Sequence, residues 1–215
     1  MQPVVYQKKF REREDRTKFI LERFPDLLNN SVLDVGCYEA PLRKLLPETD
    51  YFGIDFVGDP DLVCNLEEID ELPVENKRYD TTCCFEVLEH LESFHLVFED
   101  LFRTARKNVL VSLPNCWCSA RSPIAKGRGG IAHYGIPLEK PKDRHKWFIN
   151  SEQIINFFQQ YAEKVDGIEL KSVIGVENER PTLIRSLRRV KYSQEAYLNR
   201  YIHTVIGHFS LSDTN

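Results

Sequence analysis

The sequence SVLDVGCYEAP at residues 31–41 decides the fold, because it joins an apolar segment to an acidic turn that contains Gly36. In α/β proteins, a strand followed by a turn of this kind opens a pocket for a nucleotide. The next apolar segment, YFGIDF, contains Asp55, nineteen residues after Gly36. A carboxylate at about that separation, at the end of the next strand, reaches a ribose in such folds. The two segments together predict a cofactor that contains adenosine.

The composition is that of a folded globular protein. Hydrophobic residues make up 42% of the 215 residues and charged residues 29%, which predicts a single domain over residues 1–215. A net charge of −4 gives no overall attraction to nucleic acid or to an anionic membrane. The sequence has no apolar run of roughly 20 residues and no secretory signal. We therefore expect a cytoplasmic protein without a membrane span.

The six cysteines lack the regular spacing of a disulfide scaffold, so we expect them to be reduced. Cys116 and Cys118 form one C-x-C pair. A structural zinc site needs four ligands, and no second cysteine pair accompanies this one. The sequence predicts no metal site.

Strands alternate with helices along the chain, which predicts an α/β fold: a Rossmann-like, doubly wound, mostly parallel seven-stranded sheet with helices on both faces. The expected strands lie at about 32–35, 51–55, 61–64, 79–85, 109–113, 168–176 and 201–209. An amphipathic pattern predicts a helix over about 4–28. Residues 114–147 are too long and too rich in Gly and Pro for a simple link, and they predict a lid or an acceptor-binding insertion.

Five motifs in order between residues 32 and 115 resemble those of the class I S-adenosylmethionine-dependent methyltransferases, in particular their small type 11-like members. The motifs are VLDVGCYEAP, YFGIDF, CNLEE, YDTTCCFEVLEHL and NVLVSLPN. The resemblance implies S-adenosylmethionine as the cofactor and methyl transfer as the reaction.

The resemblance also implies a set of cofactor-binding residues. Gly36 lets the backbone approach the ligand, Asp34 offsets the cationic amine and sulfonium, and Asp55 offers two acceptors to the ribose hydroxyls. In the family, the positions of Asn65 and Leu66 contact adenine, and those of Phe85 and Glu86 line the pocket beside the methyl group. The full predicted set is Asp34, Gly36, Cys37, Tyr38, Asp55, Phe56, Asn65, Leu66, Phe85 and Glu86.

The first motif departs from the family pattern, which has glycines where this chain has Tyr38 and Ala40. If position 38 needs a positive φ, tyrosine there costs about 1 to 3 kcal/mol of strain, and its ring crowds the methionine part of the cofactor. Alternatively, the loop takes an ordinary conformation in which Tyr38 stacks or hydrogen-bonds at that end of the cofactor. The departure keeps open a second hypothesis, a catalytically silent binding or scaffold protein with the methyltransferase fold.

The insertion supplies candidates for the acceptor site. His145 or His133 is the expected general base, because an unperturbed imidazole titrates near neutrality, and Asp143 is expected to orient it. Trp147, Tyr134 and Trp117 are candidate walls around a small molecule or saccharide. Segments HYGIP and DRHKWF resemble those of methyltransferases in glycan or lipid-linked saccharide pathways. The alternative is that the aromatic residues anchor the lid and that the His–Asp pairs satisfy each other.

Two other functions fit less well. A nucleic-acid methyltransferase is suggested by basic residues in the insertion and near Arg188. However, a solvated helix face explains these charges, and FEVLEH lacks the Asn-Pro-Pro-Tyr type of motif of amino-methylating enzymes. A nicotinamide-binding domain would need G-x-G-x-x-G, which is absent from the first turn. The sequence therefore favours methyl transfer to an oxygen or nitrogen of a small molecule or saccharide.

Overall fold

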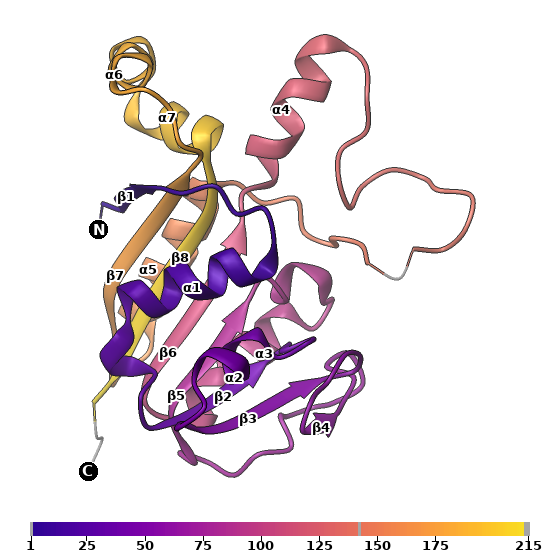
Figure 1. Ribbon diagram of the computed structural model, residues 1–215, viewed down its shortest axis with the longest axis vertical. Helices are drawn as coiled ribbons and strands as arrows, with labels where there is room; N and C mark the ends of the chain where they lie inside the picture. The colour runs from indigo at the N-terminus through magenta and orange to yellow at the C-terminus, as the bar shows by residue number, and fades with distance from the viewer. Residues whose placement is uncertain (1, 142, 213–215) are drawn as a thin grey trace.

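A computed structural model describes residues 2–141 and 143–212. Its strands form one eight-stranded sheet in the order β1-β7-β8-β6-β5-β2-β3-β4 (Figure 1). The strands are β1 (Val4–Gln7), β2 (Ser31–Val35), β3 (Asp50–Asp55), β4 (Leu62–Val63), β5 (Tyr79–Phe85), β6 (Ala105–Pro114), β7 (Ile168–Glu177) and β8 (Ile202–Leu211). Among the strands of the described residues, only β8 runs antiparallel to its neighbours, β6 and β7. The predicted α/β, Rossmann-like fold with a mostly parallel sheet is confirmed.

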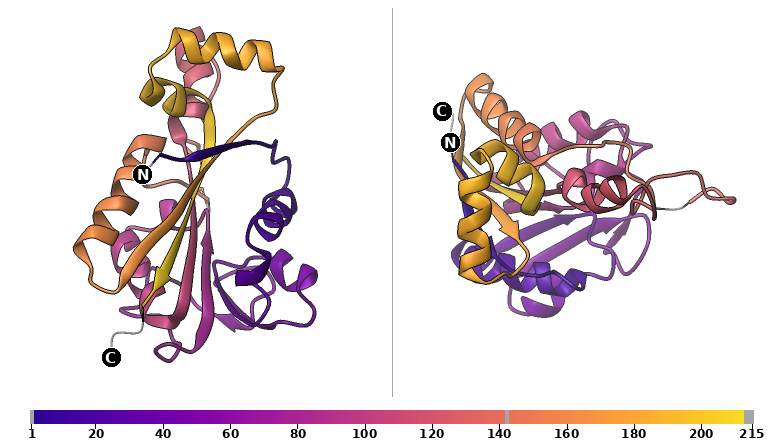
Figure 2. Two further views of the ribbon diagram at one scale, coloured as in Figure 1. Left: turned by 90° about the vertical axis from the view of Figure 1, so that its left-hand side faces the viewer. Right: turned by 90° about the horizontal axis from the view of Figure 1, so that it is seen from above.

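Helices cover both faces of this sheet (Figure 2). They are α1 (Arg13–Arg23), η1 (Pro25–Leu27), α2 (Pro41–Leu45), η2 (Leu88–His90), α3 (Phe94–Thr104), α4 (Cys116–Lys126), α5 (Ser151–Lys164), α6 (Thr182–Lys191) and α7 (Gln194–Tyr201). Side chains alternate across each strand, so that Leu33 packs under α3 and α5 while Val32 packs under α1. Burial of both faces explains the continuous apolar runs of the central strands.

The N-terminal segment corrects the prediction of a helix over 4–28. Residues Val4–Gln7 pair in parallel with Ile174–Glu177 of β7 and add an eighth strand at the edge of the sheet. A capping box between Glu12 and Asp15 begins α1 at Arg13. The helix ends at Arg23, two residues before Pro25, which cannot continue it. Periodicity was misleading here because valines suit an edge strand as well as a helix face.

Residues 114–147, the predicted insertion, begin with α4 and continue as irregular chain to Asn150. Asn115 caps α4 by accepting from the Trp117 and Cys118 N–H groups, and Gly127 ends it at a φ of 62°. Residue 142 lies outside the described residues. The segment projects from the same end of the sheet as α6 and α7 (Figure 1).

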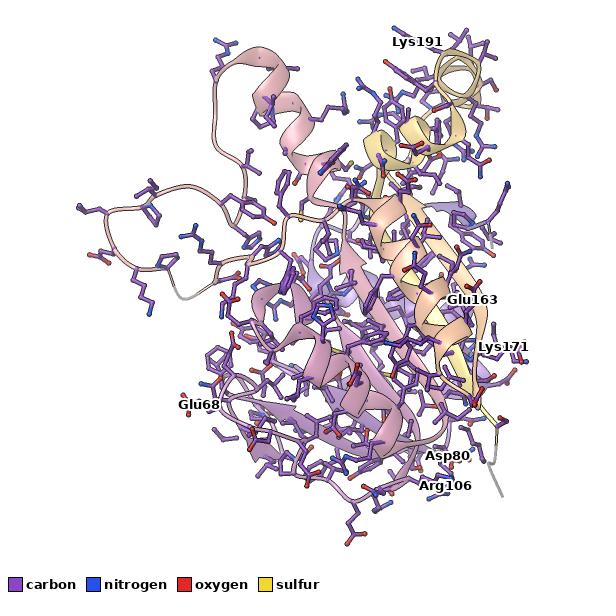
Figure 3. All side chains as sticks on the ribbon, turned by 180° about the vertical axis from the view of Figure 1, so that it is seen from behind. Glu68, Asp80, Arg106, Glu163, Lys171 and Lys191 are labelled. Atoms are coloured by element: carbon purple, nitrogen blue, oxygen red, sulfur yellow. The ribbon has the colours of Figure 1, made fainter. Side chains whose placement is uncertain are left out.

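The two ends of the sheet have different chemistry. Asp80 and Arg106, which pair at 2.9 Å, lie near the amino ends of β5 and β6, opposite Lys191 of α6 (Figure 3). Gly36, Asp55 and Glu86 follow or end strands at the other edge, where the carboxyl ends of parallel strands meet. None of the described helices has the length and apolarity needed to cross a bilayer.

Candidate cofactor and acceptor site

Gly36 makes the first turn possible by close packing. Its φ is +81°, and a Cβ there would lie 2.1 Å from Cγ2 of Val87. Its N–H donates to the carbonyl of Ile54 at 2.7 Å, which ties the turn to β3. A larger residue at this position would push the β2 turn away from the β5 turn.

Tyr38 and Ala40 both adopt the left-handed conformation, with φ values of 51° and 47°. The alternative of an ordinary loop conformation is therefore wrong, and the chain holds two non-glycine residues where glycine is favoured, at about 1 to 3 kcal/mol each. The Tyr38 ring lies under the Arg13 guanidinium, 4.2 Å from the ring centre. This cation–π contact gives the phenol ring a partner on α1.

Asp55 holds the two turns together. Its Oδ2 accepts from the Tyr38 N–H at 2.8 Å, and its Oδ1 accepts from the N–H groups of Phe56 (2.7 Å) and Val57 (3.1 Å). A carboxylate has about four acceptor positions, so three are used by the backbone. Asp55 therefore keeps one acceptor position that no described backbone group uses, and its contact with a ribose stays a prediction.

Asp34 is the next-to-last residue of β2, and its carboxyl group is buried; among the described residues its one hydrogen-bond partner is the Tyr51 hydroxyl, which donates to Oδ2 at 2.8 Å. Burial raises its pKa to about 6, although the Tyr51 hydrogen bond and Arg16 act in the opposite direction. Burial also raises the pKa of the neighbouring Cys37 thiol to about 12, so this cysteine stays a neutral, packed thiol. Asp34 is thus an anionic group that lacks a directly bound cation.

The residues predicted to contact adenine and ribose differ in exposure. Phe56, next to Asp55, is 60% exposed, which leaves an aromatic surface beside the carboxylate. Leu66 is buried in the core. The Asn65 side chain accepts from the Glu67 N–H and donates to Glu68. Contact of Asn65 and Leu66 with adenine stays a prediction.

Phe85 ends β5, and Glu86 follows it and lines a larger cavity. Glu86 has a φ of 54°, and its carboxylate forms an ion pair with Arg16 and accepts from the Thr204 hydroxyl at 2.8 Å. Arg16 also donates to the Phe85 carbonyl at 3.2 Å. The arginine of α1 therefore fixes the direction of both residues.

The larger cavity, called here the acceptor cavity, has a volume of about 490 Å³. It is lined from α1, from the turn after β5, from β8 and from the predicted insertion. The lining residues include Arg13, Arg16, Glu86, Glu89, His90, Asn115, Cys116, Ser119, His133, Tyr134, Asp143, His145 and His203. Gly36, Tyr38 and Asp55 are not among them. The turns at Gly36 and Asp55 therefore lie outside this lining, and Val87, which packs against Gly36, follows Glu86 of the lining in the chain.

The three predicted catalytic residues come together in this cavity. The rings of His133 and His145 stack at 4.3 Å, and Asp143 lies 3.3 Å from Nδ1 of His133. Asp143 also contacts Nδ1 of His90 at 3.0 Å. Asp143 therefore pairs with His133, one of the two predicted bases, and with His90. Nδ1 of His145 instead faces the thiol of Cys116 at 3.8 Å.

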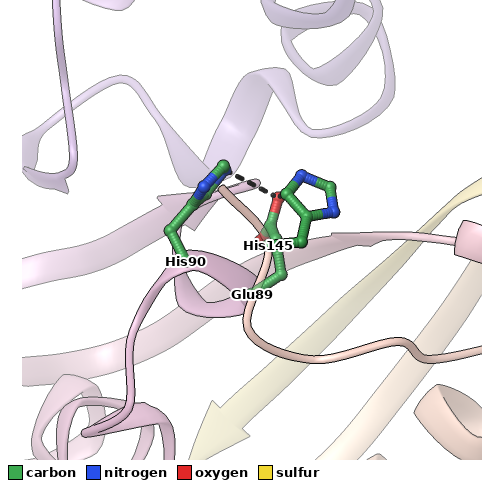
Figure 4. A group of neighbouring side chains, drawn as sticks. All are labelled: Glu89, His90 and His145. Atoms are coloured by element: carbon green, nitrogen blue, oxygen red, sulfur yellow. Dashed lines mark ion pairs between the residues drawn. The ribbon is translucent and has the colours of Figure 1, made fainter. Parts of the chain in front are cut away.

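Glu89 is a site residue that the sequence analysis missed. It is 1% exposed, its Oε2 has no hydrogen-bond partner, and its Oε1 lies 3.6 Å from Nε2 of His90 and 4.0 Å from Nε2 of His145 (Figure 4). Burial, together with the nearby Glu86, raises its pKa well above the usual range. Burial and the neighbouring histidines lower the pKa of His145 to about 4, so its imidazole is neutral at pH 7. The glutamate that precedes His90 in EVLEH was the available signal.

Backbone contacts bring the insertion to Glu89. The N–H groups of Lys146 and Trp147 donate to the Glu89 carbonyl at 2.8 and 3.4 Å, and the Trp147 indole donates to the Leu91 carbonyl at 2.7 Å. Tyr134 donates to the Trp147 carbonyl at 2.6 Å. Trp147 is therefore an anchor of the insertion, as the alternative interpretation of the aromatics held, whereas Tyr134 both anchors it and lines the cavity.

Comparison with known proteins identifies the class. Residues 6–162 match the sequence profile of the methyltransferase domain family, which is more than half of the chain. The chain belongs to this family. No curated protein sequence matches it.

Solved structures share the fold at low sequence identity. A Listeria monocytogenes protein assigned as an S-adenosylmethionine-dependent methyltransferase has a TM-score of 0.57 at 16% identity, over 94% of this chain and 99% of its own. The small RNA methyltransferase HEN1 has a TM-score of 0.61 at 16% identity, over 100% of this chain and 27% of its own. Magnesium protoporphyrin IX methyltransferase from Synechocystis PCC 6803, with bound S-adenosylhomocysteine, has a TM-score of 0.53 at 14% identity, over 93% and 84%.

The cofactor of this family is S-adenosylmethionine, as the sequence predicted. The side chains at the ends of β2 and β3 fit this cofactor. Asp34 is a buried carboxylate without a directly bound cation, which suits a sulfonium and an ammonium group. Asp55 retains an acceptor position for a ribose hydroxyl, and the exposed Phe56 ring lies next to it in the chain.

Proposed function

We propose that this protein transfers a methyl group from S-adenosylmethionine to an oxygen or nitrogen of a small molecule or saccharide in the acceptor cavity. The observation that carries the proposal is the position of the cavity, whose lining includes Glu86, the residue before the Val87 that packs against the turn at Gly36. A volume of about 490 Å³ is in the range of small-molecule sites. Polar side chains from the insertion converge on it.

The cofactor supplies a methyl group already activated on a sulfonium. Asp34 and Asp55 would hold the cofactor, and Arg16 holds Glu86 between α1 and the cavity. Bound there, the cofactor would supply its methyl group to a lone pair of the acceptor, and the electron pair of the broken sulfur–carbon bond would stay on sulfur. Positioning supplies most of the rate in a transfer of this kind.

An acceptor hydroxyl or amino group must also lose a proton, and His133 is the best-placed base. Its Nδ1 faces Asp143, so its Nε2 is left to accept a proton from the acceptor. His145 is less suited, because its two ring nitrogens face Cys116 and Glu89. Asp143 stabilises the imidazolium that forms on His133.

Cofactor binding is the first test, measured by calorimetry with S-adenosylhomocysteine. Asp55→Asn should weaken binding by about 10-fold or more, because a charge-assisted hydrogen bond contributes about 1.5 to 3 kcal/mol. Asp59→Asn is the matched control, since Asp59 lies in the same loop and is exposed. No binding by the wild type, or equal affinity in the Asp55→Asn protein, would refute the cofactor assignment.

Turnover is the second test, measured as S-adenosylhomocysteine formed with a panel of hydroxylated and amino acceptors. His133→Ala should lower the rate by about 100-fold or more and leave the affinity for S-adenosylhomocysteine unchanged. Equal rates for the two proteins would remove His133 from the mechanism.

A catalytically silent protein with this fold is the second candidate, favoured by the left-handed Tyr38 and Ala40. It predicts binding of S-adenosylhomocysteine with no turnover on any acceptor. Nucleic acid as the acceptor has less support, although HEN1 shares the fold. Arg185 of α6 pairs with Glu177, and Arg188 and Arg189 lie over the rings of Tyr201 and Tyr197, so these cations face their own protein.

A further inference from the structure

We propose that Glu89, His90 and His145 bind one divalent transition-metal ion in the wall of the acceptor cavity. One carboxylate oxygen and two imidazole nitrogens from these residues all lie within 4.8 Å of one another. All three residues line the acceptor cavity, and Figure 4 shows the two rings on either side of the Glu89 carboxyl group.

The spacing of these atoms fits an ion better than hydrogen bonds. Oε1 of Glu89 lies 3.6 Å from Nε2 of His90 and 4.0 Å from Nε2 of His145, whereas a hydrogen bond needs about 2.7 to 3.2 Å. With metal–ligand distances of about 2.0 to 2.2 Å, two ligands of a tetrahedral ion lie about 3.3 to 3.6 Å apart. The two oxygen–nitrogen distances are within about half an ångström of that range, and all three ligand atoms lie within 4.8 Å of one another, so a small closure of the rings would complete the site.

The Glu89 carboxylate supports a cation independently of this spacing. Its Oε2 is buried and has no hydrogen-bond partner in the described structure. A buried carboxylate oxygen without a partner is unfavourable unless the group is neutralised or binds a cation. No lysine or arginine is paired with Glu89 among the described residues, and the ring nitrogens of two histidines face it instead.

The surroundings of His90 are those of a metal ligand. Its Nδ1 lies 3.0 Å from Asp143 and 3.3 Å from the Arg144 carbonyl, so the proton on that nitrogen has two acceptors. Nε2 is then the unprotonated nitrogen, and it points at Glu89. A carboxylate that orients a histidine in this way accompanies most histidine–metal bonds.

Two imidazoles and one carboxylate select a transition metal such as Zn²⁺, Mn²⁺, Co²⁺ or Fe²⁺ over Mg²⁺ or Ca²⁺, which prefer oxygen ligands. Three protein ligands leave positions open toward the cavity for water or an acceptor oxygen. An acceptor hydroxyl bound there would lose its proton more readily. This last consequence rests on the proposed methyl transfer, whereas the ion site itself does not.

The test is titration of the metal-stripped protein with Mn²⁺, Co²⁺ and Zn²⁺ by calorimetry, in the absence of cofactor and acceptor. The wild type should bind one ion per chain, and His145→Ala or Glu89→Gln should weaken binding by at least 100-fold. Asp143→Asn should weaken it by about 10-fold or more. His208→Gln is the matched control, because His208 pairs with Asn108 and does not line the cavity.

Further measurements distinguish a lost ion site from a misfolded variant. Circular dichroism and urea unfolding show whether each variant is folded, and pulsed electron paramagnetic resonance of the Cu²⁺-loaded wild type should detect two imidazole ligands, with one left in His145→Ala. Cys116→Ser tests the thiol next to His145 and should bind the ion as the wild type does. Absence of ion binding by the wild type, or its loss in Cys116→Ser with retention in Glu89→Gln, would overturn the assigned site. Because no cofactor is present, either result leaves the methyl-transfer hypothesis to its own test.

Discussion

Asp34→Asn should stabilise the cofactor-free protein, and the gain should grow with pH. Asp34 is 5% exposed, and its pKa rises from 3.8 to about 6 on folding, mainly because burial disfavours the charged form. A group with a raised pKa contributes its full stability below the unfolded value and loses it as the pH rises through the folded value. The ionised carboxylate therefore destabilises the folded protein above pH 6, by about 3 kcal/mol at pH 8.

The same linkage gives about half of that at pH 5 and only a small effect below pH 3.8. An asparagine at this position stays neutral and can still accept from the Tyr51 hydroxyl, which donates to Asp34 at 2.8 Å. Asp34→Asn should therefore raise the free energy of unfolding by up to about 3 kcal/mol at pH 8 and by about half of that at pH 5.

Urea unfolding of the two proteins at pH 5 and pH 8, without cofactor, measures these differences. Tyr51→Phe is the control, because removal of the hydroxyl that stabilises the charged form should increase the loss of stability between the two pH values. Asp34→Asn should at the same time weaken binding of S-adenosylmethionine, whose positive groups the carboxylate offsets. The reasoning fails if wild type and Asp34→Asn change in parallel with pH, or if the variant is less stable at pH 8.

Three further variants test the packing of the site. Gly36→Ala should lower the free energy of unfolding by about 2 to 4 kcal/mol, because the added Cβ would lie 2.1 Å from Val87 at a residue with a positive φ. Val87→Ala in the same chain should restore part of the loss. An unchanged melting temperature for the Gly36→Ala protein would contradict this. Tyr38→Gly should change the free energy of unfolding by less than about 1 kcal/mol, because relief of backbone strain offsets the lost Arg13 contact and the extra freedom of the unfolded chain. Urea unfolding measures the change. A large loss of stability would mean that the ring contributes more than its 4.2 Å contact with Arg13 suggests. Trp147→Phe should cost about 1 to 2 kcal/mol by leaving the Leu91 carbonyl unpaired, with thermal unfolding as the measurement and Trp117→Phe, at an exposed position, as the control.

The fold could be predicted from local sequence because its signals are local. Apolar runs that end in Gly36, Asp55 or Glu86 mark strands of a parallel sheet, and the order of strands along the chain then requires the carboxyl ends to meet at one edge. The helix prediction was wrong at residues 4–7 for a different reason. Those residues become a strand only because β7, far away in the sequence, offers an open edge.

The arrangement of the acceptor cavity also depends on contacts between residues that lie far apart in the sequence. His133, Asp143 and His145 could be selected as candidates by residue type, but their pairing depends on how the irregular chain after α4 folds back. The Glu89 carbonyl accepts from Lys146 and Trp147, and this backbone contact places His145 beside the Glu89 side chain. No periodicity in the insertion indicates it.

Glu89 also shows why a buried acidic residue is informative only in three dimensions. In the sequence, EVLEH belongs to the fourth of the five motifs that resemble the family, and nothing there distinguishes Glu89 from Glu86. In the structure, Glu86 is paired with Arg16 and Thr204, whereas Glu89 has one oxygen without a partner and faces two imidazoles. A protein does not keep an unpaired carboxylate in its interior without either a proton or a cation, since burial of the bare charge is strongly unfavourable. The two glutamates of one short motif therefore have different surroundings: Glu86 is held by Arg16 of α1 and Thr204 of β8, and Glu89 gives the acceptor cavity a buried carboxyl group that holds either a proton or an ion.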